Sequence, residues 1–237
     1  MMKLFYNLQR GVGLLVFCTI LLSACVNHIS EEEEDSVNNG DIPLKFTADI
    51  HEVTYTRVAG NGFEENDEVG VFALVGSSTM KEERYADNLR FFRTSEKVFE
   101  SSEPIYYPDD EVTLRLISYY PYQEEGVNMG ESTMSVAVET DQNLSAGYFC
   151  SDFLVASQNL QSAPKGAIAL HYDHKFFKLK IALVGKEGEE LQGILDADPK
   201  LSVCGFYTKA IYDFQKETYS AFSNEKSITP AGKWEIQ

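Results

Sequence analysis

The run Val69-Gly70-Val71-Phe72-Ala73-Leu74-Val75 decides the fold class of this chain. No residue in it carries a polar side chain, which is typical of a strand covered on both faces in the middle of a sheet. Earlier in the chain, Phe46, Ala48 and Ile50 alternate with polar residues, as in a strand with one buried face. Similar alternation recurs in residues 112–116, 167–172 and 178–183. Short segments with a period of two predict β-strands.

Polar turn residues separate these segments, and no part of the sequence shows a sustained helical stripe. The pattern therefore predicts an all-β chain, with a Greek-key-like β-sandwich domain over residues 42–185. A charged run begins at Lys186 and precedes further strand-like segments at 201–208, 210–214 and 233–236. These strands either join the first core or begin a second β-sandwich domain. We expect the second arrangement. Residues 186–237 would then be only the truncated start of that domain, because so short a stretch buries too little surface to form a complete sandwich alone.

The amino terminus has the layout of a secretory signal peptide over residues 1–24. Lys3 and Arg10 precede an apolar run, which ends in Leu22-Ser23-Ala24-Cys25. This ending resembles a bacterial lipobox, which implies cleavage between Ala24 and Cys25 and acylation of Cys25. The acyl chains would anchor the protein in a membrane without a spanning helix, because each buried methylene contributes roughly 0.8 kcal/mol.

Acidic residues dominate the rest of the chain: the formal net charge is −17 for the full sequence, and it falls to −19 without residues 1–24, which contain two bases and no acid. Five consecutive acids, from Glu31 to Asp35, lie within residues 25–41 and predict a solvated tether. An acidic cluster just after a lipidated cysteine resembles the surface-export signal of Bacteroidetes lipoproteins, which implies exposure on the outer membrane. The strong negative charge argues against nucleic acid as a partner.

Motifs for chemistry are missing from the sequence. It contains no Gly-x-Ser-x-Gly elbow, phosphate loop or dinucleotide fingerprint, so we expect neither an enzyme nor a bound cofactor. His171 and His174 are three residues apart on a predicted strand, so they point to opposite faces and chelate no common metal unless a turn intervenes. We expect a β-bend with a hydrogen-bonded histidine there. Cys150 and Cys204 are expected to be small core residues, although a disulfide between them is permitted outside the cytoplasm.

Aromatic doublets are frequent, and they leave a binding function open. They occur at residues 91–92, 106–107, 119–120 and 176–177. On a strand, one residue of each doublet faces the core, but the other could contribute to a sugar-binding platform. A surface glycan-binding lipoprotein, with Trp234 or an exposed tyrosine in contact with the sugar, is therefore the alternative to the function described next.

Several segments follow the tether in a characteristic order. They are residues 42–47, Thr56-Arg57, residues 63–73, Ile105-Tyr106-Tyr107-Pro108, residues 118–122, Ser151-Asp152-Phe153-Leu154-Val155-Ala156 and residues 170–179. Behind a lipobox, this order resembles the fimbrillin family of the Bacteroidales, which includes the Mfa-like fimbrillins and forms type V pili. The resemblance covers residues 42–185 and continues at residues 205–213.

The resemblance implies an assembly mechanism and a set of partners. Fimbrillin precursors reach the cell surface as lipoproteins, and a trypsin-like protease then cuts after an arginine that follows the first strand. A strand from another fimbrillin subunit fills the groove vacated by that strand, and the fimbrium grows. In this chain, the expected cleavage lies between Arg57 and Val58. The displaced strand would contain Phe46, Ala48 and Ile50.

One departure from the family pattern concerns the carboxyl-terminal end. Family subunits carry two sandwich domains and donate a strand from that end, whereas this chain stops about a third of the way into the second. If Gln237 is the natural end, the chain accepts a strand without donating the usual one. Three explanations fit this departure, and the sequence does not distinguish them: a capping or anchoring subunit, a shortened gene, or a piece of a longer chain.

Overall fold

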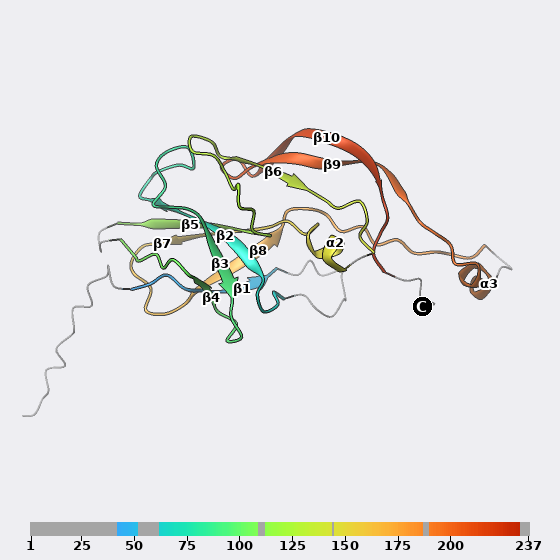
Figure 1. Cartoon of the computed structure of the whole chain (residues 1–237), viewed down its shortest axis with the longest axis horizontal. Coiled ribbons are helices and arrows are strands. Elements are labelled where there is room, and N and C mark those ends of the chain that lie inside the picture. The colour runs from blue at the N-terminus through green and yellow to red at the C-terminus, as the bar shows by residue number, and fades with distance from the viewer. Residues whose placement is uncertain (1–41, 52–61, 109–111, 144, 187–189, 233–237) are drawn as a thin grey trace, which may run out of the picture. The chain divides into compact units, whose positions relative to one another are not determined.

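The computed structural model describes residues 42–51, 62–108, 112–143, 145–186 and 190–232 (Figure 1). Its strands are β1 (Phe46–Ile50), β2 (Glu68–Val75), β3 (Ala86–Arg93), β4 (Phe99–Ser101), β5 (Leu114–Tyr120), β6 (Thr133–Ala137), β7 (Leu154–Leu160), β8 (Ile168–His174), β9 (Val203–Asp213) and β10 (Thr218–Ile228). Two short helices, α2 (Ser145–Phe149) and α3 (Leu191–Asp196), accompany them. The predicted all-β class is confirmed. Within the described ranges, no helix combines the length and apolar character needed to cross a membrane.

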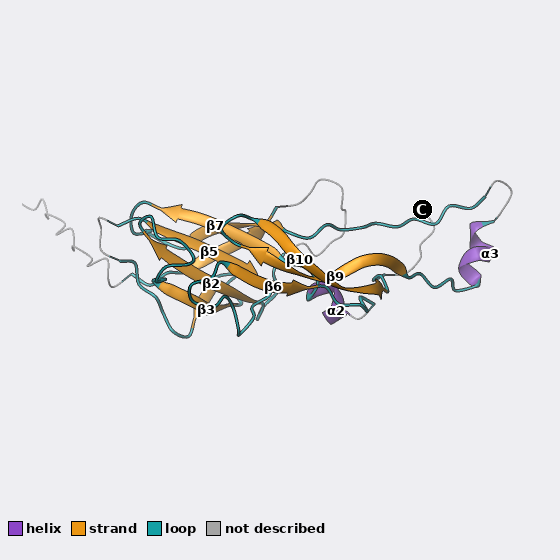
Figure 2. Cartoon of the chain, turned by 90° about the horizontal axis from the view of Figure 1, so that it is seen from above, coloured by secondary structure: helices purple, strands orange, loops and turns teal. Residues whose placement is uncertain are grey.

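Seven strands form a closed sheet in the order β1-β4-β3-β2-β5-β7-β8, and a second sheet contains β10, β9 and β6 (Figure 2). Closure depends on β1, which pairs in parallel with β8 from Phe46 opposite Ile168 to Ile50 opposite Tyr172. On its other side β1 pairs with β4 only through Phe46 and Phe99. The ring therefore differs from the pair of open sheets that a sandwich requires. The sequence pattern could not show this closure, because it reports which residues are buried and not which strands are neighbours.

The central strand β2 explains the apolar run that decides the fold class. Its residues alternate between two clusters: Val69, Val71 and Ala73 belong to a core inside the closed sheet. Phe72 and Leu74 point the other way, into a core that the second sheet covers. All six inner residues of β2 are buried, so the prediction of a strand covered on both faces is confirmed.

The strands after residue 186 contribute to the second core. β9 pairs antiparallel with β6, from Lys209 opposite Ala137 to Asp213 opposite Thr133. Its buried residues Ala210 and Tyr212 pack in the same cluster as Phe72 of β2. These contacts favour the alternative in which the later strands pack with strands of residues 42–185 and do not start a separate domain. A domain boundary at residue 186 stays a prediction, and residues 233–236 lie outside the described residues.

Two expectations about residues 178–183 and the cysteines are wrong. Residues 178–183 alternate like a strand, but they belong to no strand and lie in the long connection between β8 and α3 (Figure 2). Cys150 and Cys204 were expected in the core, yet both thiols are free and exposed. Cys150 directly follows the short helix α2, and Cys204 lies in the first half of β9, which β6 does not reach. In both cases, position in the tertiary structure overrides the apolar character of the residue.

A glycine in β2 provides a test of the close packing between β2 and β5. Gly70 is paired with Tyr119, whose buried ring occupies the space that a Cβ atom at position 70 would need. We expect Gly70→Ala to lower the free energy of unfolding by about 1–3 kcal/mol, because the ring must move in a tightly packed core. Urea denaturation measures the change. Gly166→Ala is the matched control, since a Cβ there meets no atom within 4 Å, and an equal loss in both variants would contradict the packing argument.

Candidate functional site

The candidate site is the seat of β1 in the closed sheet. Phe46 is 1% exposed, and its ring lies 4.9 Å from that of Phe91 and 5.0 Å from that of Phe99. Ala48 and Ile50 are half-buried and pack against the same core. The three residues predicted to form the buried face of the first strand therefore do share that face.

Aromatic residues from outside β1 line its seat, among them Phe63, which precedes β2, and Tyr172 of β8. Phe63 packs edge-on against Phe99 at 5.2 Å and against Tyr172 at 5.0 Å. The Tyr172 hydroxyl lies 2.5 Å from that of Ser118, which in turn donates to the Gly70 carbonyl at 3.0 Å. These contacts involve no atom of β1, so this part of the lining is built from residues outside β1.

Short contacts also hold the residues on either side of β1. Before the strand, Leu44 donates its backbone N–H to Ile105 at 2.8 Å, and Lys45 forms a 2.6 Å ion pair with Glu100 of β4. After the strand, the His51 N–H donates to the Tyr172 carbonyl at 2.8 Å. Both ends of β1 are thus fixed by neighbours of the closed sheet.

Two reciprocal histidine–aspartate pairs connect β1 to β8 on the exposed face. Nδ1 of His51 lies 2.9 Å from Oδ1 of Asp173, and Nδ1 of His171 lies 2.5 Å from Oδ1 of Asp49. The two imidazole rings stack at 5.5 Å and are nearly parallel. The hydrogen bond from His51 lowers the pKa of Asp173 below its ordinary value, and the charge of Lys175 acts in the same direction. Because His51 stands alone in the sequence, only the parallel pairing of β1 with β8 reveals this cluster.

The expected hydrogen-bonded histidine is confirmed at both His171 and His174. His171 contacts Asp49 on β1, whereas His174 contacts Asp152 at 2.7 Å, so the two rings have separate partners. The expected β-bend does not occur, since β8 runs through His174 without interruption. Among the described residues, no group of three or more histidine, cysteine, aspartate or glutamate side chains is arranged to hold a metal ion.

Four of the residues predicted from the sequence lie outside the described residues: Ala24, Cys25, Arg57 and Val58. Cleavage and acylation at Cys25 therefore stay predictions, and so does cleavage after Arg57. Arg57 belongs to residues 52–61, which directly follow β1 and His51 and precede Phe63, a residue of the β1 seat.

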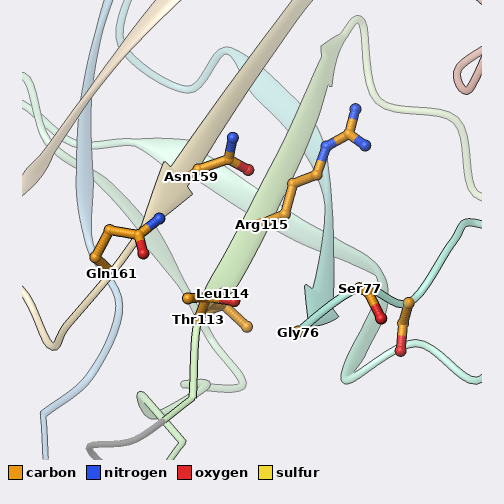
Figure 3. Close-up of a pocket in the computed structure, with 8 residues that line it drawn as sticks. Gly76, Ser77, Thr113, Leu114, Arg115, Asn159 and Gln161 are labelled. Atoms are coloured by element: carbon orange, nitrogen blue, oxygen red, sulfur yellow. The ribbon is translucent and has the colours of Figure 1, made fainter.

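A separate depression of about 290 Å³ lies near the ends of β2, β5 and β7 (Figure 3). Ser77, Thr113, Arg115, Asn159 and Gln161 contribute polar side chains to its lining. None of its lining residues is aromatic, so it offers no surface on which a sugar ring could stack. It is therefore a poor match for the glycan-binding alternative.

A family model described as fimbrillin-like matches residues 56–237. The chain belongs to the fimbrillin-like family. A curated relative of this fimbrillin-like chain, named "Putative fimbrium subunit Fim1C", comes from Bacteroides uniformis and is 24% identical over 209 residues. The match covers 84% of this chain but only 64% of the length of that relative.

Two solved structures share the fold of this fimbrillin-like chain. The crystal structure of a "putative cell adhesion protein" from Bacteroides uniformis matches with a TM-score of 0.55 at 19% identity, covering 79% of this chain and 69% of that one. A protein described in the same words from Bacteroides ovatus matches with a TM-score of 0.52 at 15% identity, covering 79% and 71% of the two chains. At these identities, the likeness establishes the fold alone.

The pair formed by His174 and Asp152 predicts a pH-dependent stability. The hydrogen bond to Asp152 raises the pKa of His174 above its ordinary value. The pair therefore stabilises the fold below the unfolded-state pKa of about 6.5, and this contribution is lost as the pH rises through the folded-state pKa. It amounts to less than about 1 kcal/mol, because the pair is partly exposed.

Melting temperatures between pH 5.5 and 8.5 measure this effect. We expect His174→Gln and Asp152→Asn to remove the same part of the pH dependence, since each variant eliminates one partner. An unchanged pH profile in either variant would show that the pair does not contribute to folding.

Proposed function

We propose that this chain is the surface lipoprotein precursor of a fimbrial subunit that assembles by protease-triggered strand exchange and serves adhesion. The observation that carries the proposal is the position of β1. It completes the closed sheet, yet it is a five-residue strand whose ladder partner is β8 along its whole length and β4 at a single residue. Replacing such a strand would break its ladder with β8 and its one pairing with β4, and none of the ladders among the other strands.

Removing β1 would leave an apolar groove between β4 and β8. Phe91, Phe99 and Tyr172 would lose their contact with β1, and the backbone of β8 would lose its parallel ladder. A strand from another subunit could restore both, since main-chain hydrogen bonds supply affinity and alternate side chains supply register. Phe46, Ala48 and Ile50 show what such a strand must present: a large aromatic residue followed by two smaller apolar residues at a period of two.

Cleavage between Arg57 and Val58 would convert a stable precursor into a subunit ready for exchange. While the chain is intact, β1 is tethered to its own seat and has a high effective concentration there, so a competing strand is excluded. After cleavage, β1 is held by non-covalent contacts alone. The sequence Ala59-Gly60-Asn61-Gly62 after the proposed site suits access by a trypsin-like protease.

The names of the relatives support a location at the cell surface. The curated relative is described as a fimbrium subunit, and the two solved structures are described as cell adhesion proteins. In our proposal, the acylated Cys25 anchors the precursor in the outer membrane, and residues 25–41 act as a tether that exposes it. After assembly, the subunit is part of the fimbrium.

A pair of exposed tyrosines favours glycan binding as a second candidate function. Tyr85 and Tyr106 are 44% and 41% exposed, and the Tyr85 hydroxyl donates to the Tyr106 carbonyl at 2.9 Å. Two neighbouring exposed rings could stack on a sugar. A glycan array probed with the wild-type chain and with the Tyr85→Ala/Tyr106→Ala variant tests this candidate, which fails if no glycan is bound or if the variant binds equally.

Brief trypsin treatment of the lipid-free chain tests the proposed maturation. We expect one early cut between Arg57 and Val58, detected by mass spectrometry of the new amino terminus. The cut chain should then form strand-linked oligomers when full-length fimbrillin subunits that carry a donor strand are added. Arg57→Gln is the matched control, because it removes the trypsin site and leaves β1 unchanged.

Phe46→Ala separates strand exchange from cleavage. It removes the main anchor of β1, so exchange after cleavage should be faster, while the rate of the cut at Arg57 is unchanged or higher. Size-exclusion chromatography measures oligomer formation over time. If the cut chain stays monomeric with every subunit added, or if trypsin cuts many sites at similar rates, assembly by strand exchange is wrong.

A further inference from the structure

A strand-like segment without a strand partner follows β8. Residues 177–184 read Phe-Lys-Leu-Lys-Ile-Ala-Leu-Val, in which apolar residues alternate with two lysines from Phe177 to Ile181. Among the described residues, however, these eight have no ladder partner and no backbone hydrogen bond. The strands on either side of this segment in the chain, β8 and β9, are both paired.

Three large apolar side chains of this segment are exposed, whereas Ile181 and Leu183 are half-buried. Phe177 is 74% exposed, Leu179 is 55% exposed and Val184 is 87% exposed. Scattered apolar residues are common on protein surfaces, but a contiguous apolar run marks an interaction site. The exposed residues, together with unpaired backbone N–H and C=O groups, have the properties of a sheet edge that can accept another strand.

The apolar surface continues from this segment onto β9. The ring of Phe177 lies 6.0 Å from that of Phe206. Tyr207 follows Phe206 on the opposite face of β9; it is 56% exposed, and its ring lies 6.3 Å from that of Phe222 on β10. β6 pairs only with residues from Lys209 onward, so this half of β9 also has a free edge on that side within the described part of the chain. In Figure 1, the connection from β8 and the far ends of β9 and β10 extend toward the same side of the molecule.

The charge of the segment indicates what kind of strand it accepts. Four lysines and no acid occur from Lys175 to Lys186, although the whole chain has a formal net charge of −17. Lys178 and Lys180 alternate with Leu179 and Ile181, so the lysines share one face of an extended segment and the aliphatic residues share the other. Side chains directly opposite each other in a ladder interact, and opposite charges there are favourable.

We propose that residues 177–184 are a second strand-docking edge, which binds an extended segment of a partner protein that alternates apolar and acidic residues. The partner backbone would form a ladder with the segment, its apolar residues would cover Leu179 and Ile181, and its carboxylates would pair with Lys178 and Lys180. A second copy of this segment fits poorly, because it would set lysine against lysine or against an apolar residue. This edge is distinct from the seat of β1, and its occupation does not require that β1 leave.

Two synthetic peptides provide the probe: an octapeptide of alternating glutamate and valine, and its counterpart of alternating lysine and valine. Binding of each labelled peptide to the lipid-free chain of residues 26–237 is followed by fluorescence anisotropy. We expect the acidic peptide to bind and the basic one to fail. Hydrogen exchange should show new protection of the amides of residues 177–184, which only a ladder would produce.

Two variants locate the binding site. Ile181→Pro removes a backbone N–H and interrupts any ladder, yet the melting temperature should not change because this residue is unpaired. It should abolish binding of the acidic peptide. In the charge-reversed variant Lys178→Glu/Lys180→Glu, the affinity for the acidic peptide should fall by about tenfold, on the scale of two exposed ion pairs. This variant should bind the basic peptide instead.

Several outcomes would overturn the proposal. They are failure of the acidic peptide to bind, equal binding of both peptides, and binding without protection of residues 177–184. Binding of anionic vesicles that is lost in the charge-reversed variant, without peptide binding, would assign the segment to a lipid surface instead. Cleavage at Arg57 and exchange of β1 should be unaffected in Ile181→Pro, so this proposal and the proposed function can fail independently.

Discussion

The packing of Phe46 between Phe91 and Phe99 is the interaction on which the closed sheet depends. It places β1 where its backbone can pair with β8. Without β1, the remaining sheet β4-β3-β2-β5-β7-β8 would have two open edges, one at β4 and one at β8. Burial of one phenylalanine contributes about 1.5–3 kcal/mol, and aromatic pairs add about 0.5–1.5 kcal/mol each. Much of the attachment of β1 is therefore concentrated in one side chain. That concentration is compatible with a strand that is stable in place and still replaceable.

A second constraint connects the two layers through β2. Because its side chains alternate between the two cores, any shift of β2 disturbs both. A buried arginine supports the outer core: the Arg84 guanidinium lies over the Phe72 ring at 5.2 Å and donates to the carbonyls of Val127, Asn128 and Glu131 at 2.8–2.9 Å. These bonds fix the turn that leads into β6, and β6 in turn positions β9. Nothing in the sequence around Arg84 indicates that this one arginine is buried.

Local patterns predicted burial well and neighbours poorly. The alternation of Ile168, Leu170 and Tyr172 was sufficient to identify the buried face of β8, because a period of two is a property of the chain itself. The cluster of His51, Asp49, His171 and Asp173 was not predictable, since its members come together only through the parallel register of β1 and β8. Cys150 and Leu179 show the opposite error: both side chains are apolar, yet both are exposed in the described part of the chain.

The sequence by itself determined the all-β class, the doubly covered central strand and the residues on the buried face of β1, because each depends on side-chain periodicity along a single segment. It also carried the order of motifs that pointed to the fimbrillin family, which the match over residues 56–237 confirmed. Only the tertiary structure decided that β1 closes a ring, that β9 joins the core through β6, and that residues 177–184 have no ladder partner within the described chain. These features depend on which distant segments pair with each other. The stability of each pairing depends on register, packing and charge between strands that are far apart in the sequence, so a local pattern does not reveal it.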